Sequence, residues 1–403
     1  MKQLLVFFIS IIILLITANC GYNANTRFVY ANQKQSIVRL NDKTYIIDLG
    51  GADCSVLRTK INALDTDLQL RAINKIIKMG FSLEEAICYV YPNFKQSVNN
   101  ICNSLLILPQ EPEVYAEDNN CKIMFKHAKN GVIVDKNALF CDFFKSLSDG
   151  SNISVKLLPT FAVDNVDNLR AKFKLVSKFE TSFATSSDSR KNNICVASKA
   201  INGQFIKSGQ VFSFNKATGT RNEQNGYKSA KVIENGAYVE GFGGGVCQVS
   251  TTLYNACILA GLPALEVHNH SLPTSYVDPA FDAMVNMGTS DLKIKNNTDN
   301  DFLITTSTVN DKCCVCIYGV MPEYTIKTRY EKYQEIPAKA DIIETDNSKY
   351  NNAYEKGEHR ISYGVNGYKA KGYLDYYKDG VLIKSELIRD NTYQARQGVV
   401  LIV

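Results

Sequence analysis

The chain has 403 residues, of which 45% are hydrophobic and 21% are charged, and its formal net charge is +5. These fractions are typical of a folded globular protein, and the length exceeds one ordinary hydrophobic core, so roughly two or three domains are expected. No stretch combines dense Lys and Arg with interleaved aromatic residues, and together with the modest charge this argues against nucleic-acid binding.

The N-terminal segment, residues 1–27, is predicted to be an export signal or an uncleaved membrane anchor. After Lys2 no charged residue follows until Arg27, and the stretch from Leu4 to Ala18 is almost wholly apolar. We therefore expect this segment to contact the cell membrane and the rest of the chain to lie outside the cytoplasm.

Residues 28–180 are predicted to form an α+β module that carries no catalytic residues. Apolar residues at helical spacing predict two helices between Asp65 and Phe94, separated at Gly80. The other expected elements are strands at Lys122–Phe125, Gly131–Val134 and Ile153–Leu158 and a helix at Asn137–Leu147. A binding or spacing role follows for this module.

The segment around Cys247 has the pattern of a presented nucleophile. Glycines at positions 241 and 243–245 precede the cysteine, and a stretch with helical periodicity follows it. Glycine leaves room for a substrate to approach, and the start of a helix favours the thiolate, which is the reactive form. The alternative is a buried cysteine after a tight turn, because most cysteines are small core residues.

A cysteine nucleophile needs a base, and two of the four histidines, His268 and His270, lie in the same region. In a strand both side chains would point to one face, so either could reach Cys247. His270 is the preferred base, with Asp282 as the group that orients it and Glu266 as second choice. The alternative is that the two histidines are polar residues at a strand end or in a loop.

Further residues are candidates for binding the substrate. Backbone N–H groups of Cys247 and of Gly244 and Gly245 are expected to form an oxyanion hole. Substrate contacts are also expected from Arg221, whose planar fork pairs with carboxylates, and from Tyr276 and Gln248. The glycine run lacks the Lys-Ser/Thr continuation of a phosphate-binding loop, so no nucleotide or other cofactor is predicted.

The twelve cysteines do not show the spacing of a disulfide framework. We expect an exported protein from reducing, oxygen-poor surroundings, in which free thiols survive. The cluster Cys313, Cys314 and Cys316 is interpreted as part of a strand at Lys312–Gly319, because no histidine or second cysteine pair lies at zinc-site spacing nearby. No metal site is predicted.

The C-terminal part, residues 323–403, is rich in Tyr and Lys and alternates as antiparallel strands do, with a hairpin signal at Lys378–Gly380. Its spaced glycines resemble a small β-rich adhesion module named for its five glycines: Gly357, Gly364, Gly367, Gly372 and Gly380, with a shifted closing glycine at Gly398. The resemblance implies contact with the cell wall. The alternative is a β extension packed on the middle domain.

Between these parts, residues 182–308 hold six unusual strings: Gly209–Asn215, Gly219–Arg221, Gly226–Lys228, Gly243–Gln248, Glu266–Ser271 and Phe281–Ala283. Together they closely resemble the VanW domain of exported Gram-positive proteins, except that Val267 stands where related sequences often carry Arg. The segment Phe125–Leu169 resembles the peptidoglycan-binding modules that precede this domain in some proteins. The expected fold is therefore α+β and multidomain, with domains at 28–180, 181–322 and 323–403 after the anchor.

The resemblance implies a link to the cell envelope and, for some family members, L,D-transpeptidase activity with the glycine-run cysteine as nucleophile. Carried to this chain, Cys247 would form a thioester and cross-link the third residues of peptidoglycan stem peptides. The expected location is the cell membrane or wall of an anaerobic Gram-positive bacterium. Two alternatives remain: a non-catalytic wall-binding protein linked to glycopeptide resistance, and a cysteine peptidase or carboxypeptidase acting on wall peptides.

Overall fold

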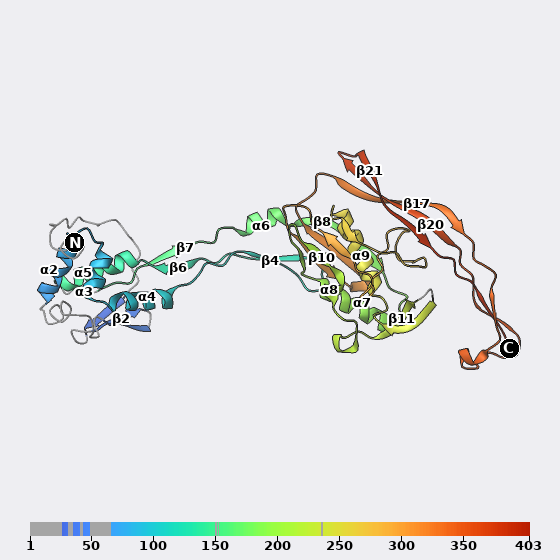
Figure 1. The fold of residues 1–403 in the computed structure, drawn as a ribbon, viewed down its shortest axis with the longest axis horizontal. Coiled ribbons are helices and arrows are strands. Elements are labelled where there is room, and N and C mark those ends of the chain that lie inside the picture. The colour runs from blue at the N-terminus through green and yellow to red at the C-terminus, as the bar shows by residue number, and fades with distance from the viewer. Residues whose placement is uncertain are drawn as a thin grey trace, which may run out of the picture. The chain divides into compact units, whose positions relative to one another are not determined.

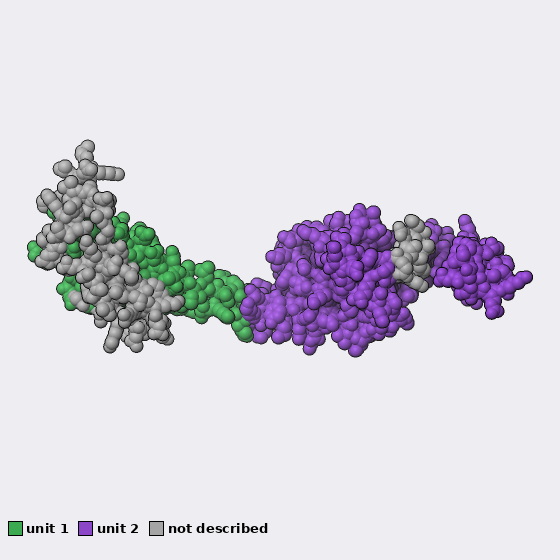
Figure 2. Space-filling model, turned by 90° about the horizontal axis from the view of Figure 1, so that it is seen from below, with its two compact units in different colours: residues 1–112, 127–165 green, residues 113–126, 166–403 purple. Residues whose placement is uncertain are grey.

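The computed structural model describes residues 26–30, 35–40, 43–48, 66–149, 151, 153–234 and 237–403. The predicted signal or anchor lies almost wholly outside these residues. Among the helices that are described, none combines the length and the apolar character needed to cross a bilayer. The chain divides into two compact units, residues 1–112 with 127–165 and residues 113–126 with 166–403, which Figure 2 colours separately. The predicted domain borders remain predictions.

The first unit contains an antiparallel sheet of β1 (Thr26–Tyr30), β2 (Gln35–Leu40) and β3 (Lys43–Asp48), helices α2 (Thr66–Ile77), α3 (Leu83–Val90), α4 (Phe94–Leu105) and α5 (Lys136–Asp149), and the antiparallel pair β6 (Gly131–Val134) and β7 (Leu157–Thr160). The helix break at Gly80 is confirmed, with φ at +90°. The predicted strand at Ile153–Leu158 is wrong over its first half, because Ile153 and Val155 are buried in the helical core instead of pairing.

The second unit begins with the hairpin β4 (Glu113–Ala116) and β5 (Ile123–Lys126). It continues through α6 (Val166–Lys172), β8 (Lys174–Ser182), α7 (Asp188–Ile201), β9 (Phe205–Ile206), β10 (Val211–Ser213), α8 (Phe214–Thr218), β11 (Ser229–Glu234), β12 (Ala237–Phe242), α9 (Val246–Leu259), β13 (Ala264–Glu266), β14 (Lys293–Lys295), β15 (Phe302–Ser307) and β16 (Lys312–Gly319) (Figure 1). A four-stranded antiparallel sheet runs β8-β16-β15-β9, and β10-β14-β13 form a smaller one. The strand predicted at Lys312–Gly319 is confirmed.

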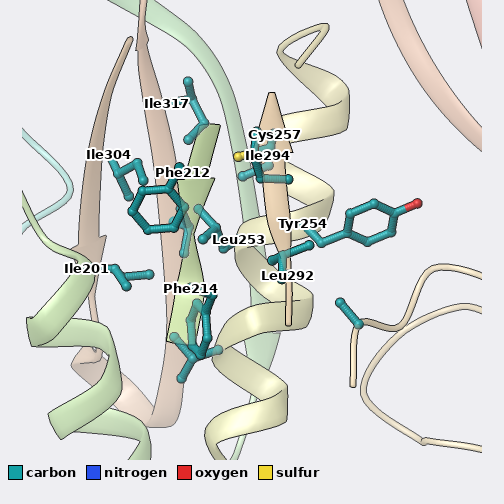
Figure 3. Close-up of a cluster of buried hydrophobic side chains, with 14 of the residues drawn as sticks. Ile201, Phe212, Phe214, Leu253, Tyr254, Cys257, Leu292, Ile294, Ile304 and Ile317 are labelled. Carbon is teal, nitrogen blue, oxygen red and sulfur yellow. The ribbon is translucent and has the colours of Figure 1, made fainter. Parts of the chain in front are cut away.

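Helix α9 lies in the middle of the hydrophobic core of this unit. It packs against β8 and β16 of the four-stranded sheet and against α7. Leu253 and Cys257 of α9 lie among side chains from both sheets, including Phe212, Ile294 and Ile317 (Figure 3). A helix buried on nearly every side can hold a residue at its end in one fixed position.

The C-terminal part is rich in β structure, as predicted. The long strands β17 (Thr325–Ile336), β20 (Gly367–Lys378) and β21 (Val381–Tyr393) form one antiparallel sheet, and β18 (Ile342–Glu344), β22 (Val399–Ile402) and β19 (Glu358–Ser362) form another. The predicted hairpin is confirmed at Asp379 and Gly380, whose positive φ angles of 51° and 80° suit a tight two-residue turn. Ile326 and Leu374 are buried in the same hydrophobic cluster as α9.

Candidate active site

The turn before α9 requires glycine at two positions. Gly243 and Gly245 have φ angles of +92° and +103°, which L side chains rarely adopt. A Cβ on Gly245 would lie 3.0 Å from Arg190 Cγ, and one on Gly243 would lie 2.8 Å from Arg221 Cδ. Gly245 is the N-cap of α9, so Cys247 stands in the first turn of the helix, as the sequence predicted.

The glycine run is also fixed from outside by a buried amide. Asn193 of α7 donates from Nδ2 to the carbonyl oxygen of Gly244 at 3.0 Å and accepts from the backbone N–H of Lys228 at 2.7 Å. Because α9 begins at this run, the N–H of Cys247 lies in the turn where a helix offers no i−4 partner. That N–H group is therefore a candidate oxyanion donor.

Polar side chains along one face of α9 hold the segment that carries Asp282. The Sγ of Cys247 lies 3.4 Å from the carbonyl oxygen and 3.5 Å from the N–H nitrogen of Val285. One turn further, Ser250 Oγ donates to the carbonyl oxygen of Ala283 at 2.6 Å, and Thr251 Oγ1 accepts from the N–H of Ala283 at 2.9 Å. The helix and the segment are thus joined in a fixed register.

The next contact along the same face completes the placement of the histidine. Asn255 Nδ2 donates to the carbonyl oxygen of Phe281 at 2.8 Å, so the residues on both sides of Asp282 are anchored to α9. Asp282 in turn accepts from His270 twice at Oδ2, from Nδ1 at 2.7 Å and from the backbone N–H at 2.6 Å. The side chains of His270 and Asp282 are 7% and 1% exposed.

The electrostatics of the group favour a thiolate beside an imidazolium. Burial acts to raise the pKa of Cys247, but the hydrogen bond and charge of His270, the N–H of Val285 and the charge of Arg221 outweigh it and hold the pKa below its ordinary value. Burial acts to lower the pKa of His270, but its bonds to Asp282 and Cys247 raise the pKa to about 10. Cys247 is nevertheless partly exposed, which a nucleophile requires.

Tyr393, at the end of β21, supplies a contact that the sequence did not indicate. Its hydroxyl donates to Asp282 Oδ1 at 2.5 Å and accepts from the N–H of Ala280 at 2.9 Å and from Asn391 Nδ2 at 3.2 Å. Each oxygen of the buried Asp282 carboxylate is therefore hydrogen-bonded. No local motif marks Tyr393, because it meets Asp282 only through the folding of the C-terminal sheet.

His268 occupies a different environment from His270. Strand β13 ends at Glu266, so the two histidines do not lie in this strand, and the argument that a strand would turn both side chains to one face does not apply. His268 Nε2 lies 3.1 Å from Glu266 Oε1, and the side chain is 41% exposed. Glu266 is also paired with Lys293 at 2.8 Å, so this second-choice carboxylate serves His268 and Lys293. His270 is the histidine whose interaction with Cys247 lowers the pKa of the thiol.

Arg221 lies next to the thiol but is partly committed to the fold. Its Nη1 donates to the carbonyl oxygen of Val285 at 3.2 Å and its Nη2 donates to Asn215 Oδ1 at 2.7 Å. Its Nε is buried without a hydrogen-bond partner. Burial lowers the pKa of Arg221, and the negative charge of Cys247 opposes that shift. Thiolate stabilisation is thus the role that these contacts favour.

Gln248 and Tyr276 line a pocket of about 620 Å³. The amide of Gln248 is 1% exposed and is fully used within the fold, since it accepts from Arg190 and donates to Thr181 and Ser182. Burial, followed by the charges of Cys247 and Asp282, raises the pKa of Tyr276. Six serines and four other residues complete the wall: Ser182, Ser186, Ser187, Ser189, Ser229, Ser275, Phe183, Thr185, Arg190 and Ala230.

A partly exposed thiol whose pKa is lowered by a buried imidazole, with that imidazole hydrogen-bonded to a buried carboxylate, is the arrangement that cysteine-dependent acyltransferases and hydrolases use. The residues around it belong to a recognised family: positions 189–318 match the family model described as VanW like protein. The chain therefore carries a VanW-like domain, as its motifs predicted.

Two curated relatives share this region. The chain is 34% identical over 164 residues to the uncharacterized protein YoaR of Bacillus subtilis (strain 168), covering 41% of this chain and 53% of the relative. It is 31% identical over 117 residues to the vancomycin B-type resistance protein VanW of Enterococcus faecalis, covering 28% and 42%. The chain thus spans about half the length of the curated relatives that it matches.

One solved structure is similar to part of the chain, with low structural similarity. The crystal structure of HP0197-G5 aligns over its whole length with 20% of this chain, at 20% identity and a TM-score of 0.12.

Proposed function

We propose that the VanW-like domain is a cysteine-dependent L,D-transpeptidase that acts on peptidoglycan stem peptides outside the cytoplasm. The observation that supports it most directly is the coupling of the partly exposed Cys247 thiol, in the first turn of α9, to His270, whose ring is hydrogen-bonded to the buried Asp282 carboxylate. The relationship to a vancomycin-resistance protein and the Gram-positive origin of both relatives support an envelope substrate.

In the first half-reaction, the Cys247 thiolate attacks the carbonyl carbon that joins the third residue of a tetrapeptide stem to its terminal D-Ala. The carbonyl oxygen becomes an oxyanion, for which the N–H of Cys247 is the proposed donor. The C–N bond then breaks, the His270 imidazolium gives its proton to the leaving amine of D-Ala, and a thioester remains. Asp282 keeps the His270 ring oriented throughout this step.

In the second half-reaction, an amine on the third residue of a neighbouring stem attacks the thioester. His270, now neutral, accepts a proton from that amine, and the C–S bond breaks to restore the thiolate and the imidazolium. The product is a cross-link between two third residues. Water as acceptor would give a tripeptide stem, which is the carboxypeptidase outcome. The pocket lined by Tyr276, Gln248 and Arg190 is the proposed seat of one stem peptide.

The test is to incubate the purified protein with disaccharide-tetrapeptide and to measure released D-Ala and cross-linked dimer by mass spectrometry. Wild type is expected to release D-Ala and to form dimer, and Cys247→Ala is expected to form neither. Cys195→Ala is the matched control, since Cys195 is an exposed thiol whose Sγ donates to Thr308 Oγ1 at 3.4 Å. Equal product from wild type and Cys247→Ala would overturn the proposal.

A further inference from the structure

Three cysteine thiols that are far apart in the sequence meet on the outer face of the four-stranded sheet. Cys314 and Cys316 are neighbours on one face of β16, and Cys121 comes from the loop between β4 and β5. The three Sγ atoms all lie within 4.8 Å of one another. In the part of the chain that the structure describes, this is the one group of three His, Cys, Asp or Glu side chains with that spacing.

The loop that brings Cys121 to the sheet is held in place by backbone contacts. The N–H of Cys121 donates to the carbonyl oxygen of Thr306 at 3.3 Å, and Tyr318 Oη donates to the carbonyl oxygen of Cys121 at 2.9 Å. Asn119 Oδ1 in the same loop accepts from the N–H of Thr308 at 2.6 Å. Cys121 also has a φ of +50°, which non-glycine residues seldom adopt. The position of this thiol is thus determined by the fold.

The face of β16 opposite to Cys314 and Cys316 is the one that packs in the hydrophobic core. Cys313, Val315 and Ile317 are fully buried in the core around α9. Because side chains alternate along a strand, Cys314 and Cys316 point to the other side, toward the β4–β5 loop. The prediction of a purely structural cysteine strand therefore describes the inner face and leaves the outer thiols unexplained.

A buried hydroxyl next to the thiols has no partner. Thr305 pairs with Cys316 across the β15–β16 ladder, so the two side chains share the outer face. Thr305 is 0% exposed, and its Oγ1 is buried without a hydrogen-bond partner. Buried hydroxyls normally have a partner, so Thr305 Oγ1 is available to donate to a ligating sulfur or to a water held at the cluster.

Positive charge also stands beside the cluster. Lys178 of β8 pairs with Cys316 and Glu180 pairs with Cys314 across the β8–β16 ladder. The Nζ of Lys178 lies 3.2 Å from a carboxylate oxygen of Glu180. Lys312 of β16 is paired with the same Glu180 at 2.6 Å, so these two lysines and one glutamate leave a net charge of +1, which offsets part of the negative charge that thiolates would bring. Cys121 is only partly buried, which leaves a route for an ion from solvent.

We propose that Cys121, Cys314 and Cys316 bind one thiophilic d10 cation, Zn²⁺ in the first instance, with its fourth position taken by water. Thiolates are the ligands that such ions prefer. A tetrahedral zinc with bonds of about 2.3 Å to sulfur places its sulfurs roughly 3.8 Å apart, which lies within the spacing of this cluster. Binding breaks three S–H bonds, forms three Zn–S bonds and releases three protons to solvent. Thr305 Oγ1 then donates to a bound sulfur or to the zinc-bound water.

The test uses the full chain in a Cys247→Ala background, so that the candidate active-site thiol cannot take up metal. The reduced, metal-free protein is titrated with Cd²⁺, and the sulfur-to-metal charge-transfer absorbance is followed. We expect saturation at about one equivalent. The additional change Cys121→Ser is expected to weaken binding at least about tenfold, whereas Cys195→Ser, which removes an exposed thiol elsewhere, is expected to leave it unchanged.

A second measurement avoids any mutation in the cluster. Saturating Zn²⁺ is expected to protect Cys121, Cys314 and Cys316 from alkylation, as read from peptide mass spectra, and to leave Cys195 unprotected. Unchanged alkylation of the three cysteines in the presence of Zn²⁺ would overturn the proposal. So would Cd²⁺ affinity in Cys121→Ser equal to that of its parent. The proposal would also be wrong if Cys121 forms a disulfide in the isolated protein and no metal is taken up after reduction. The cluster would then be a redox pair.

Discussion

Cys247 and His270 depend on each other for their charge. The pKa of the thiol is lowered and the pKa of the imidazole is raised to about 10, so the ion pair exists between these two values. As pH falls through the pKa of Cys247 the thiolate is lost, and as pH rises through about 10 the imidazolium is lost. The proposed reaction needs both, which predicts a bell-shaped rate profile with an alkaline limb near that value.

We expect this pairing to be visible in the alkylation rate of Cys247 at about pH 6. In wild type Cys247 is expected to react faster with iodoacetamide than Cys313, because burial raises the pKa of the Cys313 thiol to about 11. In His270→Gln the rate at Cys247 is expected to fall about tenfold or more, since one pKa unit changes the thiolate fraction tenfold. Peptide mass spectrometry measures each site.

The control for this experiment is His268→Gln. Its ring is paired with Glu266, so the alkylation rate of Cys247 is expected to stay as in wild type. An equal loss of rate in both variants would mean that His270 does not act on the thiol through its own hydrogen bond.

Strand β21 reaches the site through Tyr393, which makes Tyr393→Phe an informative change. The variant keeps the ring but leaves Asp282 Oδ1 and the N–H of Ala280 without this partner. An unsatisfied buried group costs about 1–3 kcal/mol, so urea unfolding should show a loss of that size. D-Ala release should fall as well, because Asp282 is less firmly held.

Tyr373→Phe on the neighbouring strand β20 is the matched control. Its hydroxyl makes an exposed contact of 3.3 Å to Glu331. Exposed contacts of this kind contribute little, so its stability should lie within about 0.5 kcal/mol of wild type. If the two variants unfold at the same urea concentration, the Tyr393 contact carries no special weight.

The turn before α9 offers a second test at the scale of an element. Gly245 and Gly288 both have positive φ angles, but an added Cβ meets open space only at Gly288. Gly288→Ala should therefore cost about 1–2 kcal/mol in unfolding free energy, from backbone strain alone. Gly245→Ala should cost about 1–3 kcal/mol more because of its crowded site, and Cys247 alkylation should slow. Equal costs would show that crowding at Gly245 is relieved without effect.

Elements with a local cause were predictable from the sequence. The helix after Cys247 and the hairpin turn at Asp379 and Gly380 follow from periodicity and turn residues. The polar residues Thr251 and Asn255 repeat at helical spacing from Cys247 inside an apolar helix. This pattern indicates a polar face on α9 that contacts another segment. The partners of these two residues were beyond reach, because contacts between distant segments leave no local pattern.

Contacts between distant segments also explain the wrongly predicted first half of the strand at Ile153–Leu158 and the lack of any sequence signal for the three-cysteine cluster. Ile153 and Val155 alternate like a strand, yet the helical core of the first unit buries them without strand pairing. Cys121 sits almost 200 residues from its thiol partners, at a separation of 193 from Cys314. Spacing rules for metal sites count only near neighbours, so they give no signal for this cluster.

At the scale of the whole molecule, the two largest hydrophobic clusters among the described residues predict two unfolding transitions. One core surrounds Phe143 in the first unit, and the other surrounds Leu253 and includes Leu374 of the C-terminal sheet. Phe143→Ala should destabilise one core and Leu253→Ala the other, each by about 3–5 kcal/mol in unfolding free energy. In differential scanning calorimetry, each change should lower the midpoint temperature of one transition. Leu374→Ala should lower the Leu253 transition. A third transition that moves only with Leu374→Ala would contradict this grouping.

The bond between Tyr393 and Asp282 also sets an order in time. The ribosome adds Cys247, His270 and Asp282 to the chain long before it adds Tyr393. At that stage the Asp282 carboxylate still lacks its hydrogen bond from the Tyr393 hydroxyl. Pairing over such a sequence separation is slow compared with local helix formation. Under the proposed mechanism, Cys247 is therefore expected to reach full reactivity only when this last long strand docks.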